Sequence, residues 1–242
     1  MKCSTGGEAA AKALIDLGVE YVFTLTGGHL NHIHMHLEGS PVKLIGTRHE
    51  QGATFMADAY GRMTGRPGVA MLTAGPGFTN ALTPIMHALF CNTPLLVIAG
   101  AAGIEHRDKL DLQDAPQIAA VTPMVKKAFV CTQASRVAEY VEMAYRTAYT
   151  GRPGPVFLEL PCDVLGAAIP GGEAPYFKTE VHSQPVDREA AAKTLEILRS
   201  ASKPIIVAGS GAGFAKAGPD LQHFIEAAGI PLYTCNMGRG IV

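Results

Sequence analysis

The chain has 242 residues, of which 48% are hydrophobic and 17% charged, and its formal net charge is -1. That length can hold one complete α/β domain and part of a second, and no basic stripe favours nucleic acid or an anionic membrane as a partner. Five scattered cysteines form no C-x-x-C pair, so neither a disulfide framework nor a zinc site is predicted. The sequence shows no signal peptide or membrane-spanning stretch, so we expect a cytoplasmic protein whose partner is a small molecule.

The first two-thirds of the chain alternate between expected helices and strands. A helix is expected over 6–17, where apolar residues recur on one helical face and Gly18 is placed to end it. Runs of β-branched, aromatic and aliphatic residues predict strands at 21–25, 42–45, 69–72, 95–99 and 156–160. Segments of helical length lie between them at 50–63, 79–90 and 137–149. Strands without polar alternation predict a doubly wound parallel sheet with helices on both faces.

The composition changes after Pro161, where Gly, Pro and Ala become frequent. We therefore expect a surface linker at 166–186, between a first domain at 1–165 and a second at 187–242. The second is expected to contain a helix, a strand, a helix and a strand at 189–200, 205–208, 214–228 and 232–235. This is the beginning of a Rossmann-like α/β domain. Two parallel strands would leave edges and apolar faces uncovered, so we expect the functional polypeptide to continue past Val242.

Four loops that follow expected strands contain unusual residues. In open α/β sheets, ligands bind beyond the carboxyl ends of the strands. The loops are Thr-Gly-Gly-His at 26–29, Thr-Arg-His-Glu at 47–50, Thr-Ala-Gly-Pro-Gly-Phe-Thr-Asn at 73–80 and Leu-Asp-Leu-Gln-Asp at 110–114. Paired glycines allow a backbone to approach a ligand closely, so these loops are where we expect the chemistry.

Each of these features also has a simpler interpretation. Glu50, at the start of a helix, can complement the helix dipole. The Gly-Pro-Gly turn does not extend to the G-x-G-x-x-G fingerprint of a dinucleotide site, because Asn80 occupies the third glycine position, and Phe214 does the same after Gly209. The histidines at 29, 32, 34 and 36 have no further ligands beside them in the sequence, so we favour packed or solvated histidines over a metal site.

In combination, these strings resemble the thiamine diphosphate enzyme superfamily. The strings are Phe23-Thr-Leu-Thr-Gly-Gly-His29, Thr47-Arg-His-Glu50 with Ala57-Asp-Ala-Tyr-Gly-Arg62, and Thr73-Ala-Gly-Pro-Gly-Phe-Thr-Asn80. Their order and spacing match the family's pyrimidine-binding domain. The likeness continues through 92–94, Gln113, Lys126 and 154–161, so it covers residues 5–165, and 203–212 resembles the start of the family's central domain.

The resemblance implies thiamine diphosphate as cofactor, which supplies a C2 carbanion that adds to a carbonyl group. Glu50 matches the carboxyl group that hydrogen-bonds N1′ of the aminopyrimidine and so promotes loss of the C2 proton. Gln113 matches a glutamine that polarises the substrate carbonyl or its alkoxide. The positions implied to contact the cofactor are Glu50, Gly28, Thr73, Pro76 and Asn80.

Part of the implied site lies outside this chain. The family holds Mg²⁺ through a Gly-Asp-Gly motif and an asparagine, and no Gly-Asp-Gly occurs here, so no metal ligand is assigned to this chain. In the family the diphosphate-binding domain usually comes from a second subunit, which implies a homodimer or homotetramer. Some relatives hold FAD in the central domain, but nothing in 187–242 supports FAD here.

His29 separates two branches of the superfamily. Acetolactate synthases carry Gly-Tyr-Pro-Gly-Gly-Ala and Ala-Phe-Gln-Glu, where this chain has Thr-Leu-Thr-Gly-Gly-His at 24–29 and Asp-Leu-Gln-Asp at 111–114. A histidine in that loop resembles benzaldehyde lyase and the 2-hydroxyacyl-CoA lyases, where it can shuttle a proton. We therefore expect a carbon-carbon lyase or carboligase acting on 2-hydroxy ketones or 2-hydroxyacyl thioesters, with Glu50, His29 and Gln113 as catalytic residues. Acetolactate synthase, or a related 2-oxo acid decarboxylase, is the alternative.

Two other classes of function are less consistent with the sequence. A non-catalytic module on this fold would be expected to have lost Glu50, which is present. A nucleotide-binding Rossmann protein would need the glycine fingerprint, which is missing.

Overall fold

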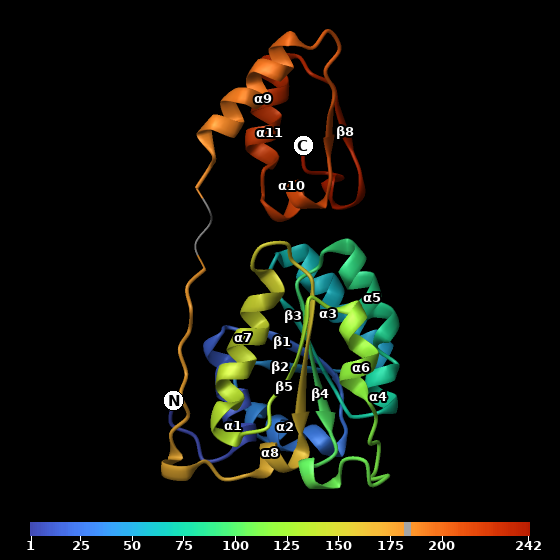
Figure 1. The fold of residues 1–242 in the computed structure, drawn as a ribbon, viewed down its shortest axis with the longest axis vertical. Coiled ribbons are helices and arrows are strands. Elements are labelled where there is room, and N and C mark those ends of the chain that lie inside the picture. Colours follow the sequence, from blue (N-terminus) through green and yellow to red (C-terminus); the bar gives the residue numbers. More distant parts are fainter. Residues whose placement is uncertain (182–184) are drawn as a thin grey trace. The chain divides into compact units, whose positions relative to one another are not determined.

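The computed structural model describes residues 1–181 and 185–242, and the chain divides into two units, Met1–Thr179 and Glu180–Val242. In the first unit a parallel sheet lies between two layers of helices (Figure 1). The strands are β1 (Tyr21–Leu25), β2 (Lys43–Gly46), β3 (Gly68–Leu72), β4 (Leu95–Ala101), β5 (Lys127–Val130) and β6 (Pro155–Pro161). The α-helices are α1 (Gly6–Asp16), α2 (Asn31–Leu37), α3 (Glu50–Thr64), α4 (Pro76–Thr79), α5 (Leu82–Cys91), α6 (Gln117–Val121), α7 (Val137–Tyr149) and α8 (Cys162–Gly166).

The strands of the first unit are all parallel and lie in the order β2-β1-β3-β4-β6-β5. From β1 the chain moves outward to β2, then returns past β1 to form β3, so the direction of winding reverses between β1 and β3. The expected fold class, a doubly wound parallel α/β sheet, is confirmed.

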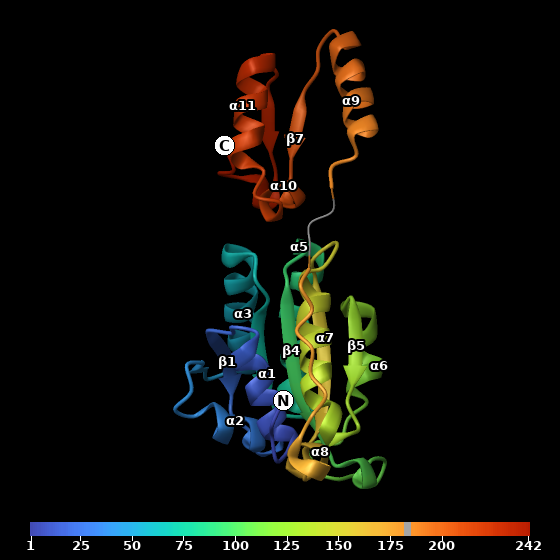
Figure 2. The same cartoon turned by 90° about the vertical axis from the view of Figure 1, so that its left-hand side faces the viewer.

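Successive residues of the central strands enter two different cores. Met71 and Leu158 belong to the core that includes α1 and α7, whereas the adjacent Leu72 and Phe157 belong to the core that includes α3 and α5. Figure 2 shows these helices from a second direction. Each fully buried side chain of this size contributes about 1.5–3 kcal/mol. Burial on both faces explains why the strands lack polar alternation.

The structure differs from the sequence-based expectation at β5 and over 79–90, and it adds the short helices α2, α6 and α8. Strand β5 was not predicted, because it is a short edge strand with an exposed Lys127 and only partly buried neighbours. The helix expected over 79–90 is two helices, α4 and α5. Pro84 fits this break because it lies in the first turn of α5, where a helix tolerates a residue without an N–H group.

The chain after α8 packs against the amino terminus instead of leaving the first unit at once. Backbone bridges join Thr5 to Ala168 and Lys2 to Glu173, and Ile169 and Ala174 are buried. The two units divide between Thr179 and Glu180, within the linker that was expected over 166–186. Residues 182–184 of the expected linker lie outside the described residues.

Lys126 has a structural role in the first unit. Its Nζ donates hydrogen bonds to the carbonyl oxygens of Thr147, at 2.6 Å, and Thr150, at 2.9 Å. These carbonyls belong to the carboxyl end of α7, where a cation offsets the negative end of the helix dipole. Burial lowers the pKa of Lys126 from its usual value.

The second unit contains two parallel strands, β7 (Ile206–Ala208) and β8 (Leu232–Thr234), and the helices α9 (Arg188–Ser200), α10 (Ser210–Phe214) and α11 (Gly218–Ala228). The Asp187 side chain caps α9 by accepting a hydrogen bond from the Ala190 N–H. The helix expected over 214–228 begins later, at Gly218, after the short helix α10. In the part of the chain that the structure describes, none of the helices has both the length and the apolar character to cross a bilayer.

His34 is the partly buried histidine of α2. Its Nε2 lies 3.2 Å from Oγ1 of Thr24, which donates its own proton to the Met71 carbonyl at 2.7 Å, so Nε2 must carry the hydrogen that it shares with Thr24. Its Nδ1 is buried without a partner among the described residues. Burial lowers the pKa of His34 from its usual 6.5.

We expect His34 to weaken the fold in acid. Below about pH 6.5 this histidine is protonated in the unfolded chain more readily than in the folded chain. The free energy of unfolding therefore decreases as the pH is lowered, by at most about 1.4 kcal/mol per pH unit from this group. Above that pH its contribution is fully present. His34→Gln keeps an N–H donor without titrating, so it should flatten the pH profile of urea denaturation, and the exposed His36→Gln should not. Identical profiles for His34→Gln and the unaltered chain would contradict this.

Candidate active site

Because the winding reverses between β1 and β3, the connections that follow these strands diverge at their carboxyl ends, and we call the region between them the crevice. The chain leaves β1 toward α2, in one helical layer, and leaves β3 toward α5, in the other. Diverging connections of this kind form the usual ligand site of an open α/β sheet. Three of the four loops identified in the sequence, at 26–29, 47–50 and 73–80, follow β1, β2 and β3.

His29, Thr73 and Gln113 form a hydrogen-bonded chain across this crevice. Thr73 Oγ1 lies 3.0 Å from His29 Nδ1 and donates to Gln113 Oε1 at 3.3 Å. A hydroxyl group has a single proton to donate, so in this network His29 must donate from Nδ1 to Thr73. The imidazole is 9% exposed. The crevice therefore holds an imidazole whose Nδ1 is bound to Thr73 and whose Nε2 is left for another partner.

Glu50 and Asn80 form a second hydrogen-bonded group in the site. Glu50 is the first residue of α3 and is only 8% exposed, and its Oε2 accepts a hydrogen bond from Asn80 Nδ2 at 2.9 Å. The side chain of His49, not that of Glu50, caps α3, since its Nδ1 accepts from the Gln51 N–H at 3.1 Å. The carboxyl group of Glu50 is thus directed toward the loop after β3.

Gly77 lies between these two hydrogen-bonded groups. A Cβ atom at this position would be 2.6 Å from Thr73 Cγ2 and 3.4 Å from Glu50 Oε1. Pro76 begins α4, and its carbonyl oxygen accepts from the Asn80 N–H at 3.1 Å, which fixes Asn80 one turn later. Gly28 is exposed and has no atom within 4 Å of the place where its Cβ would be. All seven residues predicted for the site therefore lie on the loops around one crevice.

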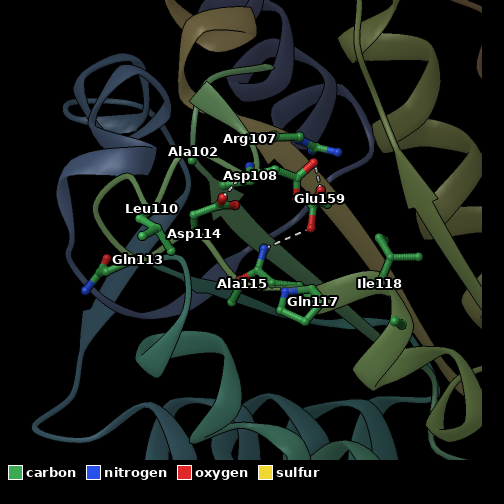
Figure 3. Close-up of a pocket in the computed structure, with 13 residues that line it drawn as sticks. Ala102, Arg107, Asp108, Leu110, Gln113, Asp114, Ala115, Gln117, Ile118 and Glu159 are labelled. Carbon is green, nitrogen blue, oxygen red and sulfur yellow. Dashed lines mark hydrogen bonds and ion pairs between the residues drawn. The ribbon is translucent and has the colours of Figure 1, made fainter. Parts of the chain in front are cut away.

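A buried polar network beside the crevice was not predicted from the sequence. Gln117 accepts the Gly75 N–H at 3.0 Å and donates to Glu159 Oε2 at 2.9 Å, and Glu159 Oε1 pairs with Arg107 at 2.5 Å. Figure 3 shows Gln117 of α6 reaching Glu159 of β6. Glu159 is a charged residue within an otherwise apolar strand, and that anomaly was the one sequence signal for this network.

A pocket of about 550 Å³ opens over this network. It is lined by Ala101, Ala102, Arg107, Asp108, Leu110, Gln113, Asp114, Ala115, Pro116, Gln117, Ile118, Ala119 and Glu159. Gln113 lies in the wall of the pocket with its carboxamide pointing away from the bond between Gln117 and Glu159 (Figure 3). Asp108, Leu110 and Gln113 all have positive φ angles, of 62°, 56° and 61°. This loop therefore holds backbone strain next to the pocket.

The histidines at 29, 32, 34 and 36 are not gathered at one point. His29 contacts Thr73 in the crevice, His34 contacts Thr24 in the core, and His32 and His36 are exposed on α2. Among residues 1–181 and 185–242, no group of three or more His, Cys, Asp or Glu side chains is arranged to hold a metal ion.

Comparison with known families matches two parts of the chain. Residues 4–121 match the thiamine pyrophosphate enzyme N-terminal TPP binding domain, and residues 191–242 match the thiamine pyrophosphate enzyme central domain. The chain belongs to the thiamine pyrophosphate enzymes. The first match includes β1 to β4 and the residues of the crevice, and the second falls within the second unit.

Curated relatives within the thiamine pyrophosphate enzymes carry several names. The chain is 32% identical to 2-hydroxyacyl-CoA lyase 2 of Danio rerio, over 98% of this chain and 44% of the relative. It is 33% identical to the acetolactate synthase large subunit of Haemophilus influenzae, over 99% and 43%. It is 29% identical to oxalyl-CoA decarboxylase of Escherichia coli, over 100% and 44%. The chain thus spans less than half the length of these relatives.

Gly77→Ala is expected to destabilise the first unit by roughly 1–3 kcal/mol, because the added methyl group would overlap Thr73 and crowd Glu50. Gly52→Ala is the matched control, since Gly52 lies in the first turn of α3 with no atom within 4 Å of its Cβ position. That substitution should leave stability unchanged or raise it by up to about 1 kcal/mol. Urea denaturation measures both, and equal stabilities would show that Gly77 is not packed as described.

Proposed function

We propose that this chain is the pyrimidine-binding half of a thiamine diphosphate-dependent carbon-carbon lyase or carboligase. Its substrates are proposed to be 2-hydroxy ketones or 2-hydroxyacyl thioesters. The observation that carries the proposal is the buried carboxyl group of Glu50, held by Asn80 at the edge of the crevice and 3.4 Å from the place that a Cβ on Gly77 would occupy. A glutamate that only complemented a helix dipole would need neither burial nor this partner.

The crevice suits the aminopyrimidine in its shape and in its polar groups. Open space beside the Gly28 backbone leaves room for a flat ring, and the missing side chain of Gly77 lets Thr73 and Glu50 lie close to that loop. Glu50 offers a carboxyl group for a ring nitrogen, and Asn80 keeps that carboxyl group in place through Oε2. Thr73 and Pro76, on the same loop, are proposed to contact the ring. The bound cofactor would supply a nucleophilic carbon able to add to a carbonyl group.

The chain's own residues then have separable roles. Glu50 holds and exchanges a proton at the ring nitrogen, and general acid-base assistance of this kind is typically worth about 10²- to 10⁴-fold in rate. His29, with Nδ1 bound to Thr73, presents Nε2 as a base toward the hydroxyl group of the substrate. Gln113, bound to Thr73 through Oε1, directs its Nε2 donor toward the substrate oxygen.

Acetolactate synthase, or a related 2-oxo acid decarboxylase, is the second candidate. It is supported by the similarity to acetolactate synthases, which is comparable to the similarity to 2-hydroxyacyl-CoA lyases. His29 favours the lyase, because cleavage of a 2-hydroxy compound requires a base for a hydroxyl proton and an imidazole can serve as that base.

The remaining parts of the proposal concern groups outside this chain. We propose that Mg²⁺ and the diphosphate are held by sequence beyond these residues, and that a second subunit supplies it within a homodimer or homotetramer. Neither FAD nor a nucleotide is included in the proposal. A cytoplasmic location is supported by the five cysteines, all of which are free thiols.

Glu50→Gln tests the carrying observation in the full-length enzyme. The amide can still hydrogen-bond a ring nitrogen but cannot exchange a proton, so deuterium exchange at C2 of added thiamine diphosphate should slow by about 10²- to 10⁴-fold. The melting temperature should change little. Glu189→Gln, at another first-turn glutamate, exposed on α9, is the matched control and should leave the exchange rate unchanged. An unchanged rate of deuterium exchange at C2 in Glu50→Gln would contradict the proposed role and leave Glu50 with only a structural role at the start of α3.

His29→Ala distinguishes the two candidate reactions. It should lower kcat for cleavage of a 2-hydroxyacyl thioester by about 10²-fold or more, while the dissociation constant for thiamine diphosphate changes by less than about threefold. Product analysis and calorimetry on the full-length enzyme measure the two quantities. An enzyme that condenses two pyruvates efficiently and leaves 2-hydroxyacyl substrates intact would make acetolactate synthase the correct assignment.

A further inference from the structure

Gln117 connects the turn of the crevice to the buried carboxylate of the sheet. Its side chain belongs to a residue that is 2% exposed, and every hydrogen-bonding group of the carboxamide has a partner. Oε1 accepts the Gly75 N–H at 3.0 Å, and Nε2 donates to the Gly100 carbonyl and to Glu159 Oε2, both at 2.9 Å. The two donated bonds use both amide protons, so the orientation of the carboxamide is fixed.

A carboxamide suits the partners at this position. Gly75 offers a donor, whereas Glu159 and Gly100 offer acceptors, so the residue between them must both accept and donate. An apolar side chain would leave a buried N–H and a buried carboxylate oxygen without partners, which is costly. A carboxylate would accept from Gly75 but would stand at hydrogen-bonding distance from another carboxylate.

Gly75 occupies a conformation that the rest of the loop depends on. Its φ of 56° and ψ of -113° belong to glycine, and a Cβ there would be 2.8 Å from the Gln113 carbonyl oxygen. The next residue begins α4, and Asn80, at the end of that helix, donates to Glu50. A shift in the Gly75 peptide is therefore transmitted over five residues to the partner of Glu50.

The other end of the network is anchored by an ion pair. Glu159 lies in β6 and is 3% exposed. Arg107, on the loop after β4, compensates its charge, since a guanidinium nitrogen of Arg107 lies 2.5 Å from Glu159 Oε1. A buried carboxylate is costly unless it is paired and hydrogen-bonded. Here both of its oxygens have partners, so the network holds Gln117 against a rigid strand.

We propose that Gln117 is a positioning residue for Glu50: it fixes the Gly75 turn, and through α4 and Asn80 it sets where the Glu50 carboxyl group lies. Its effect on turnover rests on the proposed function, but its effect on the turn does not. The side-chain hydrogen bonds of Gln117 go to Gly75, Gly100 and Glu159 and not to Glu50, so we infer that it acts through the backbone and not on the reacting atoms.

Amide hydrogen exchange tests the first step on the chain itself. In Gln117→Leu the protection factor of the Gly75 amide should fall roughly 3- to 10-fold, the loss expected for one net hydrogen bond. Gln133→Leu, at an exposed glutamine of the same unit, should leave it unchanged. Unchanged protection in Gln117→Leu would overturn the proposal.

Gln117→Glu should restore the protection of the Gly75 amide at low pH, a result that a role of Gln117 in packing alone does not predict. The charged groups near position 117 are Glu159 on β6 and Arg107, Asp108 and Asp114 on the loop before α6. Beside Glu159 the pKa of the introduced carboxyl group rises. Below that pKa it is protonated, so it donates to Glu159 and accepts from Gly75, and Gly75 protection should return as the pH falls. Above that pKa protection should be lost, and protection that does not change with pH would overturn the proposal.

Turnover in the full-length enzyme tests the second step. Gln117→Leu should lower kcat by about tenfold or more with KM nearly unchanged, because a misplaced catalytic group impairs the reaction more than binding. Wild-type kcat in a variant whose Gly75 protection has fallen would sink the link to Glu50. An unaltered enzyme that exchanges no deuterium at C2 of thiamine diphosphate would instead remove the proposed function and leave the result on the turn standing.

Discussion

Burial of the parallel sheet on both faces is the constraint on which the rest of this structure depends. The central strands carry apolar side chains into two cores, so their surfaces have little room for chemistry. Polar side chains are therefore concentrated where the strands end, and the reversal between β1 and β3 is where the connections diverge. His29, Thr73 and Glu50 each follow a strand at that edge. The site is thus a consequence of topology before it is a consequence of any one residue.

The sequence was sufficient for most of the sheet and for locating the loops of the candidate site, because both have local signals. Apolar runs mark β1, β3, β4 and β6, and the Gly-Pro-Gly turn marks the loop after β3. Strand β5 has no such run, because an edge strand is only partly buried. It owes its place to pairing with β6, a contact between residues that lie far apart in the sequence.

The network of Gln117 could not be predicted for the same reason. Its partners are 42 residues away on either side, at Gly75 and Glu159. A glutamine in a short helix looks like a solvated residue, and only the three-dimensional pairing of β4 with β6 brings it to a buried carboxylate. The one local clue was a glutamate inside an apolar strand, which signals that some partner exists but not which one.

Glu159 and Glu50 show how one fold can use buried carboxyl groups in two ways. Glu159 is paired with the guanidinium of Arg107 and with the Gln117 amide, so its charge is compensated and it serves as an anchor. Glu50 is bound by Asn80, a neutral amide that orients the carboxyl group without compensating its charge. A carboxyl group held in this way is oriented through one oxygen, and its other oxygen can bind a ligand in the crevice. The two glutamates are linked through Gln117, Gly75 and α4. In our proposal, the ion-paired Glu159 anchors Gln117 and so helps to hold the carboxyl group of Glu50 in place.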